Sequence, residues 1–148
     1  MGKLVCLRGK ACKRVVRSLS GTQRILVKSK RIGVLEAVID SAENPRTAKA
    51  VVESLPLEGE VQVWGDEVYF EVPLSLPKEN ARVKVALGEI AYWPEGEAIC
   101  IFFGKNPASP SENDIRAYSP VNVFGKILGD PKVLKALKAG DKIRLDKA

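Results

Sequence analysis

The stretch "AYWPEGEAICIFFGKNP", residues 91–107, combines a strongly apolar segment with four of the nine aromatic residues of the chain. Turn-forming residues at 94–96 and 104–107 bound the segment AICIFF. A short apolar run between turn residues is typical of a strand that is buried on both faces of a sheet. The pattern leaves two interpretations open: a hairpin of the core, or the wall of a site that binds a ligand.

Further short strands are predicted on both sides of this stretch, because apolar and polar residues alternate there. RILVKS (24–29) and GVLEAVID (33–40) read as two strands joined by a turn. EVQVWGDEVYFEV (60–72) has the pattern of a hairpin that turns at Gly65 and Asp66. More strand is predicted within RVKVALGEIAYW (82–93), SPVNVFGKIL (119–128) and DKIRLD (141–146).

A helix is predicted within ENPRTAKAVVESLP, residues 43–56. Asn44 is expected to cap it, Pro45 suits its first position, and Pro56 ends it. Its apolar residues recur at helical spacing and form one stripe, made of Ala48, Val51, Val52 and Leu55.

A second helix is predicted within GDPKVLKALKAG, residues 129–140, from the same order of signals. Asp130 is expected to cap it, Pro131 to open it and Gly140 to end it. The order of all these elements lacks the βαβ rhythm of a parallel sheet. It therefore predicts a mostly antiparallel barrel or sandwich with two helices at its ends.

The length of the chain, 148 residues, suits one domain. Its charge is unevenly distributed along the sequence. Residues 1–35 contain ten Lys or Arg and no acidic residue, whereas the remaining residues carry a net charge of −4. We expect a basic N-terminal extension over residues 1–22 and a folded domain over residues 23–148. The charge of the extension would attract nucleic acid, although no aromatic residue is present there to stack on bases. An Arg-rich mitochondrial presequence is the alternative.

Three cysteines and no histidine limit the metal and redox chemistry. Cys6 and Cys12 lack the usual spacing of a zinc site, although they remain a candidate disulfide. Cys100 lies in the apolar run and is expected to be a small buried side chain. Neither a metal site nor a cofactor is expected. Without a secretory signal, a disulfide framework or a membrane-spanning run, the sequence favours a cytoplasmic protein with no membrane partner.

Several ordered motifs between residues 24 and 146 resemble the cyclophilin fold. NPRTAKAVVESL (44–55) looks like the first cyclophilin helix, and VNVFGKILGDPKVLKAL (121–137) is similar to the strand that leads into the second. The match is closer to a small prokaryotic cyclophilin-like group of no established activity, which carries the motifs found here at 64–70, 92–96, 102–105 and 121–127. The resemblance implies a closed antiparallel β-barrel of about eight strands capped by two helices.

Cyclophilins are prolyl isomerases in which an arginine polarises the proline amide and an apolar pocket holds the proline ring. Most of these residues differ here. The strands within 60–72 contain no arginine, Ile101 stands in place of the family glutamine, and Val121 stands in place of the histidine. The family tryptophan falls near Arg116, and only the pocket phenylalanine is retained, as Phe103. The resemblance therefore implies a barrel without the usual catalytic set.

Five residues are candidates for a ligand-binding groove, and packing in the core or on the surface is the alternative for each. The resemblance places Phe103 in the groove. Trp93 precedes a proline at a strand end, which suits a ligand rim. Tyr69 alternates away from its apolar neighbours Val68 and Phe70. Arg116 and Asn122 flank the start of the strand that follows the loop at 104–114, and they could hold a carboxylate or an amide. The set is Tyr69, Trp93, Phe103, Arg116 and Asn122.

Three hypotheses of function follow. The first is a module that binds a peptide or a small molecule without catalysis. The second is a weak prolyl isomerase, or a divergent enzyme that uses Tyr69, Arg116 and Asn122. The third is association with nucleic acid through residues 1–22. The acidic pairs Asp66-Glu67 and Glu95/Glu97 lie in predicted turns, where carboxylates are usually solvated, so neither pair is expected to be catalytic.

Overall fold

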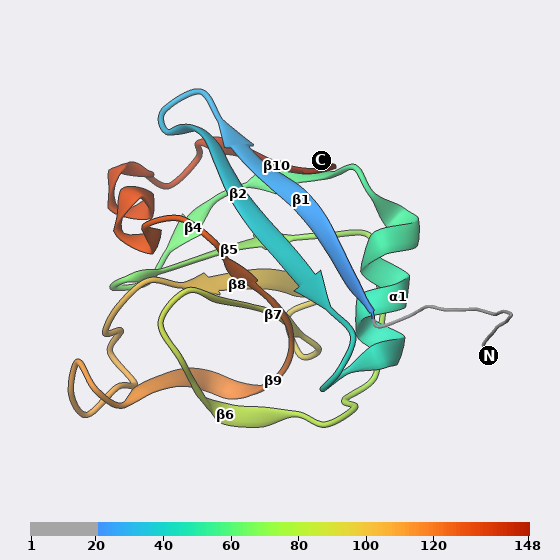
Figure 1. The fold of residues 1–148 in the computed structure, drawn as a ribbon. Coiled ribbons are helices and arrows are strands. Elements are labelled where there is room, and N and C mark those ends of the chain that lie inside the picture. Colours follow the sequence, from blue (N-terminus) through green and yellow to red (C-terminus); the bar gives the residue numbers. More distant parts are fainter. Residues whose placement is uncertain (1–20) are drawn as a thin grey trace, which may run out of the picture.

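The computed structural model describes residues 21–148, which form a sheet of ten antiparallel strands with one α-helix and one 3₁₀ helix (Figure 1). The elements in chain order are β1 (Thr22–Ser29), β2 (Gly33–Asp40), α1 (Pro45–Ser54), β3 (Leu57–Glu60), β4 (Gln62–Val63), β5 (Glu67–Glu71), β6 (Arg82–Val85), β7 (Glu89–Trp93), β8 (Ala98–Phe102), β9 (Ile115–Ile127), η1 (Pro131–Ala136) and β10 (Lys142–Lys147). No helix in this part of the chain is long and apolar enough to cross a membrane.

The sheet curls, so that its two edge strands, β3 and β4, are consecutive in the chain. Its strand order is β3-β10-β1-β2-β9-β7-β8-β5-β4, with β6 added to β9. The edge strands β3 and β4 are separated by Val61 alone, and Val61 exchanges backbone hydrogen bonds with the turn before β10. Within the described residues, no pairing between edge strands closes the ring. The predicted closed barrel of about eight strands is therefore wrong in its strand number and in its closure.

Two additional strands are present: the predicted segment 82–93 is divided into β6 and β7, and β3 precedes the predicted hairpin at 60–72. Gly88 has a φ of +85°, a conformation that glycine adopts without strain, and the turn around it separates β6 from β7. Both pieces pair with the long strand β9, β6 with its first half and β7 with its second half. As a result the first half of β9 lies over the outer face of the sheet, and this arrangement creates the site described below.

The two helices lie at opposite ends of the sheet in Figure 1, as expected. Ala48 and Val51 of α1 and Leu134 of η1 are buried in the same core. The second helix is a 3₁₀ helix of six residues rather than a longer α-helix, although Asp130 accepts a hydrogen bond from the Lys132 N–H, as a cap does.

Asn44 occupies the predicted N-cap position of α1, but its side chain does not cap the helix. The Asn44 side chain makes no capping bond; its amide donates to the Val123 carbonyl (2.8 Å) and its oxygen accepts from the Asn80 N–H (2.7 Å). The free N–H groups of Arg46 and Thr47 donate instead to the carboxylate of Glu79, each over 3.1 Å. A residue distant in sequence thus supplies the oxygen that local capping rules assign to Asn44.

The core has two parts on opposite faces of β8, and every residue of β8 is buried. Ile99 and Ile101 belong to the main core, inside the curled sheet. Cys100 and Phe102 belong to a smaller cluster on the outer face, together with residues of β6, β7 and β9. The prediction of a strand buried on both faces is confirmed.

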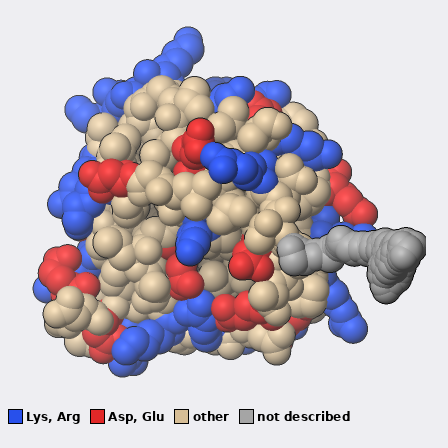
Figure 2. Space-filling model, viewed as in Figure 1, with Lys and Arg blue, Asp and Glu red and all other residues tan. Residues whose placement is uncertain are grey.

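Figure 2 shows Lys and Arg interspersed with Asp and Glu over one face of the molecule. Residues 1–20 lie outside the described residues. The predicted basic extension, its contact with nucleic acid and the Cys6–Cys12 disulfide therefore stay predictions.

Candidate functional site

A pocket of about 230 Å³ opens on the outer face of the sheet, under the first half of β9. Aromatic side chains form most of its wall, and one carboxyl group lies among them. Its lining residues are Trp64, Glu67, Tyr69, Trp93, Cys100, Ala117, Tyr118 and Val121. We call this the aromatic pocket.

Strand geometry explains how the rings meet. Tyr69 of β5 and Trp93 of β7 pair with Cys100 and Ala98 of β8, so they project on one face from the two strands that flank β8. Their ring centroids are 5.9 Å apart and their planes are nearly perpendicular, at 84°. Tyr118 of β9 makes similar edge contacts with Trp93 (6.1 Å) and with Trp64 (5.9 Å). The four rings form a continuous wall with faces in several directions.

The orientation of Trp93 is set on two sides. Its indole N–H donates a hydrogen bond of 2.6 Å to the Ser119 hydroxyl. Its six-membered ring lies against Gly96, where an added Cβ would come within 2.3 Å of the ring atoms. The ring is therefore held in place without a ligand. Tyr118, in contrast, is 71% exposed and lies at the mouth of the pocket.

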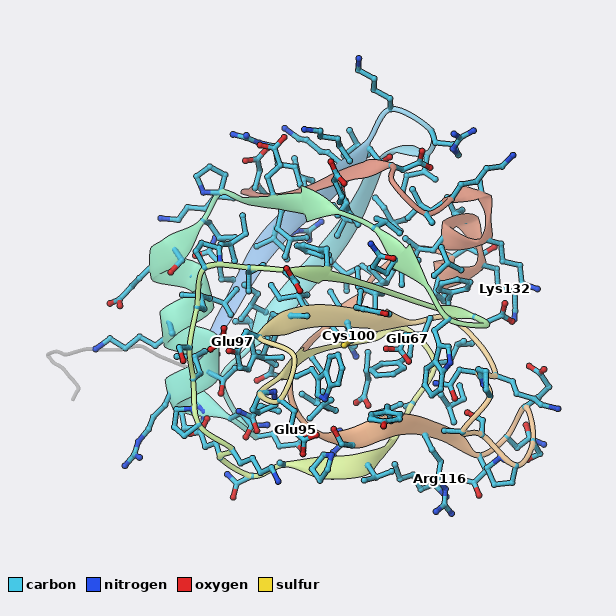
Figure 3. All side chains as sticks on the ribbon, turned by 180° about the vertical axis from the view of Figure 1, so that it is seen from behind. Glu67, Glu95, Glu97, Cys100, Arg116 and Lys132 are labelled. Atoms are coloured by element: carbon cyan, nitrogen blue, oxygen red, sulfur yellow. The ribbon has the colours of Figure 1, made fainter. Side chains whose placement is uncertain are left out.

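Glu67 is the polar residue of the pocket floor and is only 5% exposed. One carboxyl oxygen accepts a hydrogen bond of 3.0 Å from the Asn106 side-chain amide, and the Cys100 thiol lies beside the carboxyl group. Figure 3 shows Glu67 and Cys100 near one another. Burial raises the pKa of Glu67 to about 7, although the interactions with Cys100 and Asn106 oppose this shift. The prediction of a solvated turn carboxylate is wrong for Glu67.

The loop after β8 positions the partner of Glu67. Asn106 is buried, and its amide nitrogen donates both to Glu67 and to the Arg116 carbonyl, the latter over 2.7 Å. Its side-chain oxygen accepts from the Ala108 N–H and the Ser109 hydroxyl, at 2.9 and 3.0 Å. Because every hydrogen-bonding position of this amide is used in a specific direction, the loop holds the Glu67 carboxyl in one orientation.

The structure brings two of the five sequence-predicted site residues together, Tyr69 and Trp93. Phe103 does not line the aromatic pocket; it is 2% exposed in the main core. Arg116 extends away from the pocket on the far side of β9 and pairs with Asp114 over 2.9 Å (Figure 3).

Asn122 is fully buried below the loop that precedes β6. Its amide donates to the Thr47 hydroxyl (3.0 Å) and the Pro77 carbonyl (2.9 Å), and its oxygen accepts from the Glu79 N–H (3.0 Å). Through these contacts the Asn122 side chain holds the loop before β6 against α1, and Asn122 lies away from the aromatic pocket.

Sequence reasoning did not select Trp64, Glu67 or Tyr118 as site residues. A signal for Glu67 exists: alternation with period two places it on the same face of β5 as Tyr69. No comparable signal exists for Tyr118, because its place depends on how β9 crosses the sheet. Residues 21–148 contain no group of three His, Cys, Asp or Glu side chains arranged to hold a metal ion.

The comparisons with known proteins agree with this architecture. A family model described as cyclophilin-like matches residues 24–146, so the chain belongs to the cyclophilin-like family. The solution structure of the hypothetical protein AF2241 from Archaeoglobus fulgidus is 33% identical, with a TM-score of 0.75, over 90% of this chain and 100% of that one. No curated protein of similar sequence matches the chain.

A structure of McbB in complex with tryptophan shares the fold at a TM-score of 0.64 and 15% identity. The match covers 83% of this chain and 44% of McbB.

Proposed function

We propose that this domain is a binding module, and that the aromatic pocket receives one ring-sized group of a peptide or of a small molecule. The observation that carries the proposal is a preformed wall of four aromatic rings above a buried carboxyl group. Such a mixture of apolar surface and a few oriented polar groups is characteristic of ligand sites.

The dimensions of the pocket support a ligand group of limited size. Its volume of about 230 Å³ is below the range of roughly 300–1,000 Å³ that is usual for drug-sized ligands. One side chain or one small ring system therefore matches it better than a long peptide segment. Since the Ser119 hydroxyl and Gly96 already hold Trp93 in position, binding does not require this ring to be ordered.

The geometry does not favour the enzyme hypothesis built on Tyr69, Arg116 and Asn122. Tyr69 lines the pocket, Arg116 extends away from it, and Asn122 is buried in another network. We expect exchange NMR on an X-Pro peptide to show the same cis/trans rate with and without the protein. A faster rate would revive the isomerase hypothesis.

The two tryptophans of the chain provide the direct test, because both line the aromatic pocket. We would titrate the ¹⁵N-labelled protein with benzyl alcohol and with the N-acetyl amides of Pro, Leu and Phe. Binding is expected to shift both indole N–H signals. Tyr69→Ala should weaken the effect, whereas Leu87→Ala, at an exposed residue outside the pocket lining, should leave it unchanged. Indole signals that do not move with any probe at millimolar concentration would refute the proposal.

A further inference from the structure

The Glu67 carboxyl has no positive partner within the described part of the chain. No Lys or Arg nitrogen of residues 21–148 lies within ion-pair distance of it, and the polar side chains beside it, the Asn106 amide and the Cys100 thiol, are both neutral. A carboxylate removed from water without a counter-charge is costly, and it normally ionises only when a cation is near. The aromatic pocket thus has a potential negative charge at its floor with no compensating charge.

This carboxyl group has room for a further donor. An ionised carboxylate offers roughly four acceptor positions, and the Asn106 amide occupies one of them. Glu67 also lines the pocket, so a bound group can reach it. A ligand N–H would find an acceptor whose direction the Asn106 loop has already set.

The aromatic wall, like the Glu67 carboxylate, favours a positively charged ligand. The face of an aromatic ring carries partial negative charge and attracts cations, most strongly when the site is shielded from water. The rings of Trp64, Tyr69, Trp93 and Tyr118 meet at angles of 77–84°, so a group inside the pocket is surrounded by ring surfaces in different orientations. An anion would be repelled by these faces and by the carboxylate.

From this geometry we propose that the ligand of the aromatic pocket is an organic ammonium ion. Its positive charge contacts the ring faces, its N–H groups donate to the Glu67 carboxylate, and its apolar body fills the remaining space. This inference rests on the proposed function, because it assigns the chemical class of the ligand that the same pocket binds.

Binding of a cation is coupled to the ionisation of Glu67. The other titratable groups that line the pocket are the Cys100 thiol of β8 and the phenols of Tyr69 on β5 and Tyr118 on β9. The carboxylate of Asp66, the residue before Glu67, lies 3.6 Å from the Lys135 ammonium. With a pKa of about 7 for Glu67, most of the carboxyl is protonated at pH 6 and most is ionised at pH 8. Affinity for an ammonium ion should therefore rise by about tenfold over this interval.

The test compares two probes of nearly equal shape, benzylammonium and benzyl alcohol, by NMR titration of the two indole N–H signals. At pH 8 we expect benzylammonium to bind about tenfold more tightly than the alcohol. Glu67→Gln should remove both this preference and the pH dependence. The matched control Glu95→Gln, at an exposed carboxylate of the turn after β7, should retain both.

The possible outcomes separate the two proposals. If the alcohol binds as tightly as the ammonium ion, the inference is wrong and the binding module stands. If neither probe binds, the inference is wrong, and the binding module is wrong as well when the N-acetyl amides of Pro, Leu and Phe also fail to bind. If the Glu67→Gln variant is unfolded, the pH dependence of the wild-type protein decides: affinity for benzylammonium that is equal at pH 6 and pH 8 would overturn the role of the carboxylate.

Discussion

At residue 67 a carboxyl group is held in a folded environment that favours its protonated form. Burial raises its pKa from 4.5 to about 7, so the folded protein binds this proton more tightly than the unfolded chain does. The contribution of Glu67 to stability therefore decreases as the pH rises from about 4.5 to about 7. The shift corresponds to roughly 3 kcal/mol of unfolding free energy.

The substitution Glu67→Gln should make the protein more stable above pH 7, because it removes the buried negative charge while Asn106 keeps an oxygen to donate to. We expect a gain of about 1–3 kcal/mol at pH 8 and little difference at pH 5, measured by chemical denaturation across this range. Glu95→Gln serves as the exposed control and should follow the wild-type profile. Parallel profiles for Glu67→Gln and wild type would show that Glu67 does not titrate in this range.

Gly96 is required by the ring of Trp93. In Gly96→Ala the new methyl group would lie 2.3 Å from ring atoms of Trp93, so the ring must move away from Ser119. We expect a displaced Trp93 indole N–H signal in NMR spectra and a stability loss of about 1–3 kcal/mol, the usual cost of overpacking. Glu95→Ala in the same turn should change neither quantity. An unmoved indole signal in Gly96→Ala would contradict this account.

At the scale of elements, the loop between β8 and β9 depends on one buried amide. Asn106→Ala leaves the Glu67 carboxyl, the Arg116 carbonyl and the Ala108 N–H without their partner. We expect a loss of roughly 3 kcal/mol, since each buried polar group left unsatisfied costs about 1–3 kcal/mol. The exposed Asn113 of the same loop provides the control, and Asn113→Ala should be near neutral. Equal midpoints for the two variants in thermal unfolding would refute the role assigned to Asn106.

The elements themselves were predictable where their signals are local. Alternation identified the strands around Gly65, and the apolar run 98–103 identified β8. Local signals failed where a distant partner intervenes. Asn44 has the right residue type for a cap, yet its side chain is drawn into bonds with β9 and the loop before β6, and Glu79 caps the helix instead.

At the scale of the whole molecule, Asp141 joins segments that are 110 residues apart. Its carboxylate accepts from the Arg31 guanidinium at 2.6 and 3.0 Å and from the Lys138 N–H at 2.8 Å. The hydrogen bond from Arg31, with that of the Lys138 backbone, lowers the pKa of Asp141 to about 2. Since the folded pKa lies below the ordinary value of 3.8, this contact stabilises the fold above about pH 3.8 and is lost as the pH falls through about 2.

Asp141→Asn should therefore lower the thermal unfolding midpoint at pH 7, and the difference from wild type should disappear at pH 2. The exposed helix residue Glu53 offers a control, and Glu53→Gln should match the wild type at pH 7. Differential scanning calorimetry at the two pH values measures both effects. A midpoint difference that persists at pH 2 would mean that Asp141 acts through packing rather than through its charge.

The amino-acid sequence by itself determined the class of the fold, because alternation, turn residues and helix signals act over a few neighbouring residues. It also suggested Tyr69, Trp93 and Phe103 as parts of one aromatic groove, and of these Tyr69 and Trp93 line the aromatic pocket on one face of the sheet. Only the tertiary structure decided that this face is covered. The period of two assigns Glu67 to a face of β5, but the first half of β9 and the Asn106 loop bury it there. Segments distant in the chain also decide that Phe103 is buried in the core and that Arg116 is exposed to solvent.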